Sequence, residues 1–561
     1  MPKKSKDATT DSRWDSQVRL LAWLATCASV FSFLFYFKLG DVLLYGDAIA
    51  HINIARRVFD SQTPGLLQLG TVWLPLPHLL MIPFLISDAM WQRGVGGSIP
   101  SMAAYVLGAI GMFRLVRRVL AHDGGRDRVA SLAAWSAALV YAANPNLIYM
   151  QTTAMGETMY LALFLWSLVY LSEWLRGDGK ALTKCGLCLG AGCWTRYDGW
   201  FLAAMVAATV VGILMFRGTS GESRFPRFQV SRAAIAKFLL IVAAAPALWL
   251  VYNGIVYRNP LEFANGPYSA KAIERRSQNA GSQGHPGSGN LMVAGMYFVK
   301  SAEINVANSD WLQRGWLVSA IAGFISVLFL ARRYGSTGES RLARYIPLAF
   351  LLVPVPFYAL SVAYGGVPIF IPPWWPFSHY NVRYGLQLLP VFAVAVGLIV
   401  YTLVVSEQWN LRVRLSCVFG VLVFAAASGA SIWRATPVCL KEAQVNMKTK
   451  NELETQLAIW LGKLPVNSTL LMYLGDHVGA LEKAGIPFKR VINEGNHRVW
   501  RRPADPEGLW ERALADPGQY VDYVVAFEGD SVWQAVQSRH LKALVELHTT
   551  GQAPAILYRA R

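Results

Sequence analysis

Five ionisable side chains stand at the ends of apolar runs, where they could do chemistry at a membrane surface. Asp47 and His51 follow the first run. Glu157 begins a later run, and Arg196 and Arg383 stand at the ends of two others. A carboxylate can accept a proton from a nucleophile, and the planar fork of arginine binds a phosphate through two hydrogen bonds. Because ionisable residues near membrane depth are costly, the set predicts group transfer from a lipid phosphate.

Each of these residues also has a structural interpretation. Glu157 would stabilise the N-terminal end of its helix through the helix dipole. Asp198, which follows Arg196 in W-T-R-Y-D-G-W, is expected to be a local partner of that arginine rather than a catalytic group. A single histidine such as His51 is more typical of a satisfied interfacial position than of a ligand. Arg196 and Arg383 are the more informative pair, because the basic clusters of the alternate connections lie on the opposite side.

The segment that must position Asp47 runs from Asp41 to Pro83. At helical spacing Asp47 and His51 share one face, which Ile54 and Val58 continue. A Pro-Gly pair at 64–65 breaks this helix, and the proline-rich start of 74–92 is poorly suited to a spanning helix. The segment is therefore predicted to be an interfacial loop whose short helices lie along the membrane.

A long loop at 258–314 is predicted on the same side as Asp47. Its basic residues, with one histidine, stand beside a Gly/Ser-rich stretch, and they are Lys271, Arg275, Arg276 and His285. Loops of this composition are mobile and can close over a substrate. Lys271 and Arg275 are therefore candidate substrate-binding residues.

The composition excludes a soluble globular protein. Of the 561 residues, 54% are hydrophobic and only 15% are charged, and the mean hydropathy is +0.33. The chain is thus an α-helical polytopic membrane protein. Its net charge of +18 fits basic loops held against anionic membrane lipids better than it fits a nucleic-acid partner. The six cysteines lack histidine partners at zinc-site spacing, so no structural metal is predicted.

About eleven apolar runs are long enough to be transmembrane helices, for which about 20 residues are needed. They lie near 18–39, 98–116, 129–146, 157–175, 185–198, 200–216, 236–257, 315–331, 345–364, 385–405 and 414–434. Basic clusters fall in alternate connections, on the side of the N-terminal tail 1–17. The positive-inside rule makes that side cytoplasmic. The predicted topology is a multi-pass protein of the cytoplasmic (inner) membrane, with an uncleaved N-terminal anchor and its C-terminal part outside.

The tail 435–561 has a different character. It is polar and alternates helical patterns, at 451–464 and 506–515, with strand-like runs at 469–473, 523–527 and 555–558. That alternation predicts a small extracytoplasmic α/β domain. Residues 18–434, including the first outer loop 40–97, would then form the membrane-embedded part.

The chain resembles the GT-C membrane glycosyltransferases, especially protein O-mannosyltransferases and lipid A aminoarabinose transferases. The order of the motifs, their spacing and the side of the membrane on which each is predicted agree with that family over most of 18–434, although no single motif is highly specific. The matching features are Gly46-Asp47, Ala55-Arg56, Leu74-Pro75-Leu76-Pro77, the loop from Asn144-Pro145 to Glu157, W-T-R-Y-D-G-W with Arg196, and Y-N-V-R-Y-G-L-Q-L-L-P with Arg383 and Tyr384. Many members have Asp-Glu at the first motif, whereas this chain has Asp47-Ala48.

The resemblance implies an inverting transfer of a sugar from a polyprenyl-phosphate donor to an extracytoplasmic acceptor. Asp47 would be the general base, and Arg196 and Arg383 would hold the leaving phosphate. Glu157 would orient the acceptor, or would hold a divalent ion together with His51. No cofactor is otherwise implied, and the tail domain would recognise the acceptor or cap the site.

A transporter or flippase for a lipid-linked sugar intermediate is the main alternative. Transporters tend to place charges near the bilayer midplane, in broken helices and internal repeats. In this sequence the charges gather at one surface and no repeat recurs at a fixed spacing. A receptor-like or structural membrane protein would leave the outward arginines unexplained. The pattern therefore favours the transferase.

Overall fold

The computed structural model describes residues 16–121, 127–217, 231–279, 284–334, 343–406, 408–497 and 507–561. Parts of the segments discussed in the sequence analysis lie outside these ranges. They are most of the N-terminal tail, Arg126, Arg224, Arg227 and Arg341 of the basic connections, and residues 280–283 of the Gly/Ser-rich stretch.

Helices make up most of the described chain. In the first half they are α1 (Ser16–Leu39), α2 (Gly46–Arg57), α3 (Pro75–Leu85), α4 (Asp88–Gln92), α5 (Val95–Leu120), α6 (Asp127–Ala142), α7 (Pro145–Met150), α8 (Glu157–Leu175), α9 (Ala181–Cys193), α10 (Asp198–Arg217), α11 (Arg232–Tyr257), α12 (Glu262–Asn265) and α13 (Ala270–Asn279). In the second half they are α14 (Leu291–Val306), α15 (Asp310–Tyr334), α16 (Ile346–Ala349), α17 (Pro354–Tyr364), α18 (Leu389–Val405), α19 (Leu411–Ala435), α20 (Val438–Leu461), α21 (Gly479–Ala484), α22 (Leu509–Ala515), α23 (Pro517–Tyr520) and α24 (Ser531–Val536).

Within the described residues, nine helical segments are long and apolar enough to cross a membrane. They are α1, α5, α8, α10, α11, α15, the α16–α17 pair, α18 with the 3₁₀ turn η6 (Val382–Leu388) before it, and the segment that begins at α19. The other two predicted spans are the shorter helices α6 and α9, of 16 and 13 residues. These two pack inside the bundle, α6 against α5 and α18, and α9 against α8 and α11. The chain is a multi-pass membrane protein, as its composition predicts.

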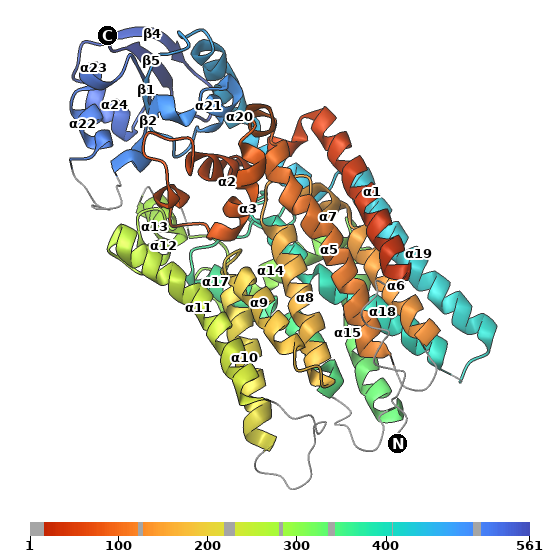
Figure 1. Ribbon diagram of the computed structural model, residues 1–561. Helices are drawn as coiled ribbons and strands as arrows, with labels where there is room; N and C mark the ends of the chain where they lie inside the picture. Colours follow the sequence, from red (N-terminus) through yellow and green to blue (C-terminus); the bar gives the residue numbers. More distant parts are fainter. Residues whose placement is uncertain are drawn as a thin grey trace.

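The first outer loop contains short helices. α3 has 11 residues, about 16 Å at 1.5 Å per residue, which is too short to cross a bilayer. It packs against α2 and α5, and both α2 and α3 lie at the end of the bundle nearest the C-terminal part (Figure 1). An interfacial position for 74–92 is consistent with these lengths.

The loop at 258–314 is more ordered than its composition suggested. It contains α12, α13 and the 16-residue helix α14, and α14 packs against α17 and η6. Tyr297, Phe298 and Ala302 of α14 are buried there. The sequence prediction missed α14 because it assigned spans by charge alternation, and a helix that stays on one side of the membrane does not alter that pattern.

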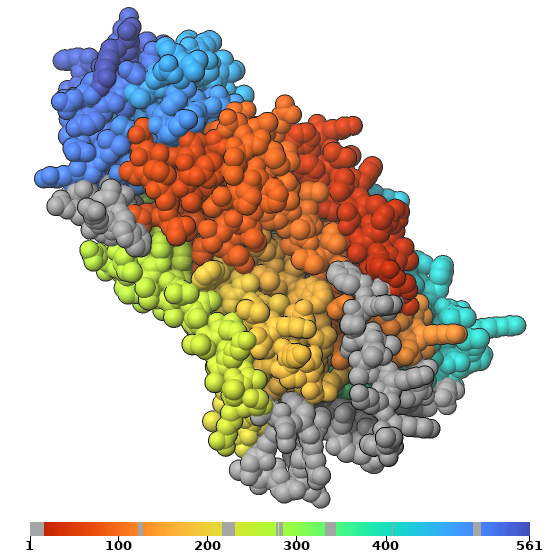
Figure 2. Space-filling view, in the orientation of Figure 1, coloured from red at the N-terminus to blue at the C-terminus, as the bar shows by residue number. Residues whose placement is uncertain are grey.

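The C-terminal part is an α/β unit around a five-stranded sheet. Its strands are β1 (Leu470–Met472), β2 (Val491–Ile492), β3 (Tyr523–Phe527), β4 (Lys542–Leu547) and β5 (Ala555–Arg559), in the order β2-β1-β3-β5-β4. β1 runs parallel to β2 and β3, whereas β5 is antiparallel to β3 and β4. This unit forms a lobe at one end of the molecule (Figure 2), and α20 leads into it from the bundle (Figure 1).

Polar contacts join this lobe to the first outer loop. Asn53 of α2 donates from Nδ2 to Glu482 Oε2 of α21 at 2.7 Å, and Trp91 of α4 donates to Asn53 Oδ1 at 2.8 Å. The Trp91 ring also lies 5.7 Å from that of Phe488, between ring centroids. α2 is therefore held between the bundle and the lobe, and this fixes its N-terminal end, where Asp47 lies.

Candidate active site

Arg383 is the centre of the site, and the backbone around it is tightly constrained. It is the second residue of the 3₁₀ turn η6. This turn begins directly after Asn381, whose φ of 55° is in the left-handed region that asparagine tolerates. Two residues after Arg383, Gly385 packs on α14 so closely that an added Cβ would stand 2.5 Å from Ala302 N. The Arg383 residue itself is only 6% exposed. The backbone that carries the guanidinium is therefore constrained both before and after Arg383.

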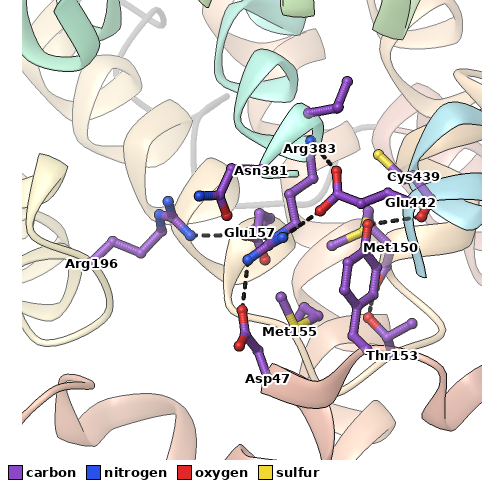
Figure 3. A network of polar contacts seen from close by, with 12 residues as sticks. Asp47, Met150, Thr153, Met155, Glu157, Arg196, Asn381, Arg383, Cys439 and Glu442 are labelled. Carbon is purple, nitrogen blue, oxygen red and sulfur yellow. Dashed lines mark hydrogen bonds and ion pairs between the residues drawn. The ribbon is translucent and has the colours of Figure 1, made fainter. Parts of the chain in front are cut away.

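Three carboxylates from three separate elements surround this guanidinium (Figure 3). Nη2 lies 2.6 Å from Asp47 Oδ2 of α2, and Nε lies 3.2 Å from Glu157 Oε1 at the start of α8. Nη1 lies 2.5 Å from Glu442 Oε1 of α20. Charge-assisted hydrogen bonds of this kind are the stronger ones in proteins, so Arg383 ties the first outer loop, the bundle and the C-terminal part together.

Arg196 reaches the same carboxylate from the α9–α10 connection. Its Nη1 lies 2.9 Å from Glu157 Oε1, so one oxygen atom of Glu157 accepts from both arginines. Its Nε lies 3.3 Å from Asp198 Oδ2, and its Nη2 donates to Tyr358 Oη at 2.9 Å. Tyr358 in turn donates to Asp198 at 3.1 Å. Asp198 thus contacts Arg196, as their spacing predicts.

The ring of Tyr384 lies beside both arginines. The guanidinium carbons of Arg196 and Arg383 lie 5.0 and 5.1 Å from its centroid, and a second ring, that of Tyr45, lies 5.0 Å from Arg383. Cations at this distance over an aromatic face are attracted to it. The two positive charges are therefore held close together by Glu157 and Tyr384.

The carboxylates around Arg383 differ in their access to solvent. The side chains of Glu157 and Glu442 are 1% and 0% exposed, whereas that of Asp47 is 40% exposed. Asp47, Arg383 and Tyr384 line a cavity of about 550 Å³, together with Tyr380 and Asn381. That volume lies within the usual range for small-molecule sites. A ligand in the cavity can therefore contact both Asp47 and Arg383.

The long outer loop supplies one wall of this cavity, though not through its cations. Ala270, Ile273 and Glu274 of α13 line it, while Lys271 and Arg275 are exposed and are not among the lining residues. His285 Nε2 lies 3.0 Å from Glu274 Oε1 at the same wall. The structure therefore does not bring Lys271 and Arg275 to Arg383.

The direct polar partners of His51 and Arg56 lie outside the arginine pair and its carboxylates. His51 Nδ1 lies 2.8 Å from His78 Nε2, and burial lowers the pKa of His51 to about 4, so its ring is neutral at pH 7. Arg56 lies 2.8 Å from Asp60 and 2.6 Å from Asp88, and donates to the Leu85 carbonyl. These contacts occupy Arg56 in holding α2 to the following segment.

The side chains named for a divalent ion do not form a cation site. Glu157 Oε1 faces two guanidinium groups, and His51 faces His78. Among the described residues, no group of three or more His, Cys, Asp or Glu side chains could hold a metal ion. Because Glu157 Oε1 already accepts from both arginines and the His51 ring is paired with His78, these side chains do not fit a metal ion, and no step is assigned to one.

The sequence analysis did not identify Glu442 as a residue of the site. It lies in the segment assigned to the tail, yet it is fully buried against Arg383. A signal was present, because Cys439, Glu442 and Ala443 recur at the i, i+3, i+4 spacing of one helical face, and all three are buried. A carboxylate on a buried stripe requires a partner. No pattern in the sequence, however, identified Arg383 as that partner.

Comparisons with known proteins support the fold. No family model and no curated protein matches the chain by sequence. The crystal structure of ArnT from Cupriavidus metallidurans bound to undecaprenyl phosphate matches it with a TM-score of 0.54 and 13% identity, over 97% of this chain and 98% of that one. The apo structure of the same protein gives 0.54 and 14%, with the same coverage.

A third structure is an Archaeoglobus fulgidus oligosaccharyltransferase tethered to an acceptor peptide containing the NVT sequon. It matches with a TM-score of 0.42 and 11% identity, over 96% of this chain and 74% of that one. The assignment of the fold rests on the two ArnT structures, because each matches over almost the full length of this chain and of its own. The predicted GT-C fold, a helical membrane part followed by a small C-terminal sheet, is confirmed.

Proposed function

We propose that this GT-C-fold protein is a glycosyltransferase that moves a sugar from a polyprenyl-phosphate-linked donor to an extracytoplasmic acceptor. One observation carries the proposal: Arg383, which shares Glu157 with Arg196, lines a ligand-sized cavity together with the half-exposed carboxylate of Asp47. An arginine pair suits the phosphate of such a donor. Undecaprenyl phosphate, which the similar ArnT structure binds, is a lipid of this class.

The charge of the site indicates how a phosphate would enter. Four carboxylates (Asp47, Glu157, Asp198 and Glu442) surround two guanidinium groups, which gives a net charge of 2 − 4 = −2 with all of them ionised. A further anion binds only if one carboxylate withdraws. Asp47 is the one on the cavity, and the donor phosphate replaces it at Arg383 Nη2.

The same exchange prepares the chemical step. Once Asp47 is displaced, its carboxylate is free to accept the proton of the acceptor nucleophile. The nucleophile forms a bond to the anomeric carbon from the face opposite the phosphate, and the bond from that carbon to the phosphate oxygen breaks. The electron pair leaves with polyprenyl phosphate, and Arg196 and Arg383 offset the growing negative charge. The configuration at the anomeric carbon inverts.

The membrane arrangement follows from the same proposal. Residues 18–434 form the catalytic part of a cytoplasmic-membrane enzyme, with the N-terminal tail inside and residues 435–561 outside. The prenyl chain lies among the apolar helices, next to membrane lipids. The site lies at the end of the bundle that carries the C-terminal lobe (Figure 1), where an extracytoplasmic acceptor has access.

The test is release of polyprenyl phosphate by the purified full chain from a panel of polyprenyl-phosphate-linked sugars. We expect release from at least one donor. Arg196→Lys keeps the charge but loses the fork, and it should raise the donor KM about ten-fold. Asp178→Asn, at the far end of α8, is the control and should change nothing. Movement of the lipid-linked sugar between leaflets without any release would favour a flippase and contradict the proposal.

A further inference from the structure

A second cavity, of about 650 Å³, lies in the C-terminal lobe at the carboxyl ends of its parallel strands. Tyr473, Asp476 and His477 follow β1, Glu494 follows β2, and Glu528 follows β3. β1 is flanked by β2 on one side and β3 on the other. The chain passes from β1 to β2 on one side and then crosses to β3 on the other, so the strand order reverses here. Open α/β sheets bind ligands at such a point.

The charge of this cavity is opposite to that of the whole chain. Five carboxyl side chains line it: Asp476, Glu494, Glu511, Glu528 and Asp530. Arg276 is the one arginine among the described lining residues. Burial lowers the pKa of His477 to about 4, so this ring adds no positive charge at pH 7. In a protein of net charge +18, this is a strongly acidic pocket.

Some of these carboxyl groups stabilise the fold and others do not. Asp530 accepts hydrogen bonds from the backbone N–H of Trp533 and Phe527, and Glu494 accepts one from Leu474. Asp476 and Glu528 are exposed, and neither carboxylate makes a hydrogen bond or ion pair within the described part of the chain. These two remain available for a ligand.

A buried polar ring provides a second, independent observation. His477 is 7% exposed, stacks on Phe527 at 4.2 Å between ring centroids, and lines the cavity. Its Nδ1 has no hydrogen-bond partner among the described residues. Buried polar atoms are nearly always paired, so this ring is placed to hydrogen-bond a ligand.

Aromatic side chains complete the wall. Tyr268, on the loop before α13, lies with its Oη 3.4 Å from that of Tyr473, and Tyr268 is 45% exposed. Aromatic faces and carboxylates together suit a ligand with an apolar ring face, several hydroxyl donors and a positive charge. An amine-bearing saccharide has all three.

We infer that this cavity binds an amine-bearing saccharide unit of the acceptor. α13 and the residues flanking it stand between the two cavities. Ala270, Ile273 and Glu274 line the site of Asp47 and Arg383, while Tyr268 and Arg276 line this one. A saccharide held here places its neighbouring residues on the route to the catalytic site. The role as acceptor site rests on the proposed transferase function, whereas the binding itself does not.

The test compares two matched sugars on the full chain in nanodiscs. One is the glucosamine trisaccharide, and the other is its fully N-acetylated counterpart, which has the same rings without the charge. We expect the amine form to bind about ten-fold more tightly at low salt, and salt to weaken it. Joint Asp476→Asn and Glu528→Gln should abolish the difference. Glu452→Gln, an exposed position on α20, should preserve it.

Three results would overturn the inference. They are equal binding of the two sugars, no binding of either, and binding of a trilysine peptide with no binding of the amine sugar. The same preparations are assayed for release of polyprenyl phosphate. Loss of release with intact sugar binding would contradict the transferase proposal alone, while normal release without sugar binding would contradict the second cavity alone.

Discussion

In the proposed mechanism the Asp47 carboxylate competes with the donor phosphate for Arg383. The Asp47 carboxylate lies 2.6 Å from Arg383 Nη2, and both residues line the same cavity. The residue proposed as the base therefore also blocks the phosphate position. In the proposed mechanism this carboxylate becomes free to accept the acceptor proton only after the donor phosphate has displaced it from Arg383.

Asp47→Asn should separate the two roles of the side chain. Turnover should fall by about 10²- to 10⁴-fold because the amide cannot take a proton. Binding of polyprenyl phosphate should become tighter, since a competing negative charge has been removed from Arg383. Kinetics of polyprenyl phosphate release and equilibrium binding of the same lipid measure the two effects.

Asp41→Asn is the matched control for that variant. Asp41 is acidic and lies in the same outer loop, but its carboxylate is not among the groups around Arg383. It should behave like the parent in both measurements. Weaker lipid binding by Asp47→Asn, or equal loss of turnover in the two variants, would show that the loop needs its charge as a whole.

The packing of η6 on α14 sets the position of Arg383 at the scale of elements. Gly385→Ala would drive a methyl group against the backbone of Ser301 and Ala302. Overpacking of this kind costs about 1–3 kcal/mol, and it should also shift the guanidinium from its partners. We expect a lower thermal midpoint together with a loss of release activity.

Gly420→Ala in α19 provides the comparison for Gly385→Ala. An added Cβ at Gly420 meets nothing within 4 Å, and alanine is the better helix former. Its thermal midpoint should be equal to that of the parent or slightly higher. If Gly385→Ala behaves like Gly420→Ala, then the close contact with α14 does not position the site.

The contact between α2 and α21 should make stability depend on pH. Burial raises the pKa of Glu482 to about 8, and its carboxyl group meets Asn53. Between the ordinary glutamate pKa of 4.5 and about 8, the folded state keeps this proton and the unfolded state does not. Stability therefore falls as pH rises through this range, by up to about 1.4 kcal/mol per pH unit.

Glu482→Gln should remove this dependence, because the amide stays neutral at every pH. The thermal midpoint of the full chain, measured from pH 5 to pH 9, should slope downward less in the variant than in the parent. Glu452→Gln, on the exposed face of α20, should retain the parent slope. Parallel curves for Glu482→Gln and the parent would mean that Glu482 is ionised in the folded protein.

The orientation of the whole molecule predicts two labelling patterns in a cysteine-free background. Val466, in the C-terminal lobe, is 81% exposed, and Gly179 lies in the connection between α8 and α9, at the end of α8 opposite Glu157. With the N-terminus inside, an impermeant maleimide should label Val466→Cys in intact cells. Gly179→Cys should react only after the membrane is opened. The reverse pattern would invert the topology.

The sequence by itself determined the features that depend on local composition and period. A run of about 20 apolar residues can form a transmembrane helix whatever its tertiary contacts. The prediction therefore located each spanning helix and also α6 and α9. The change from apolar to alternating polar segments located most of the C-terminal sheet. The prediction missed strands β2 and β4. β2 has only two residues, too few to show an alternating hydrophobic pattern, and most of β4 is exposed, so it has no row of buried apolar residues.

Only the tertiary structure decided which charges meet. The carboxylates around Arg383 lie far from it in the sequence, and no spacing rule relates them to it. They are Asp47, Glu157 and Glu442. Three other basic side chains carry the same charge as the arginines of the site but do not join it. Arg56 is paired with Asp60, and Lys271 and Arg275 are exposed to solvent. Residue type states what a side chain can do, whereas helix packing decides what it faces. A buried guanidinium is stable only where that packing brings carboxylates to it.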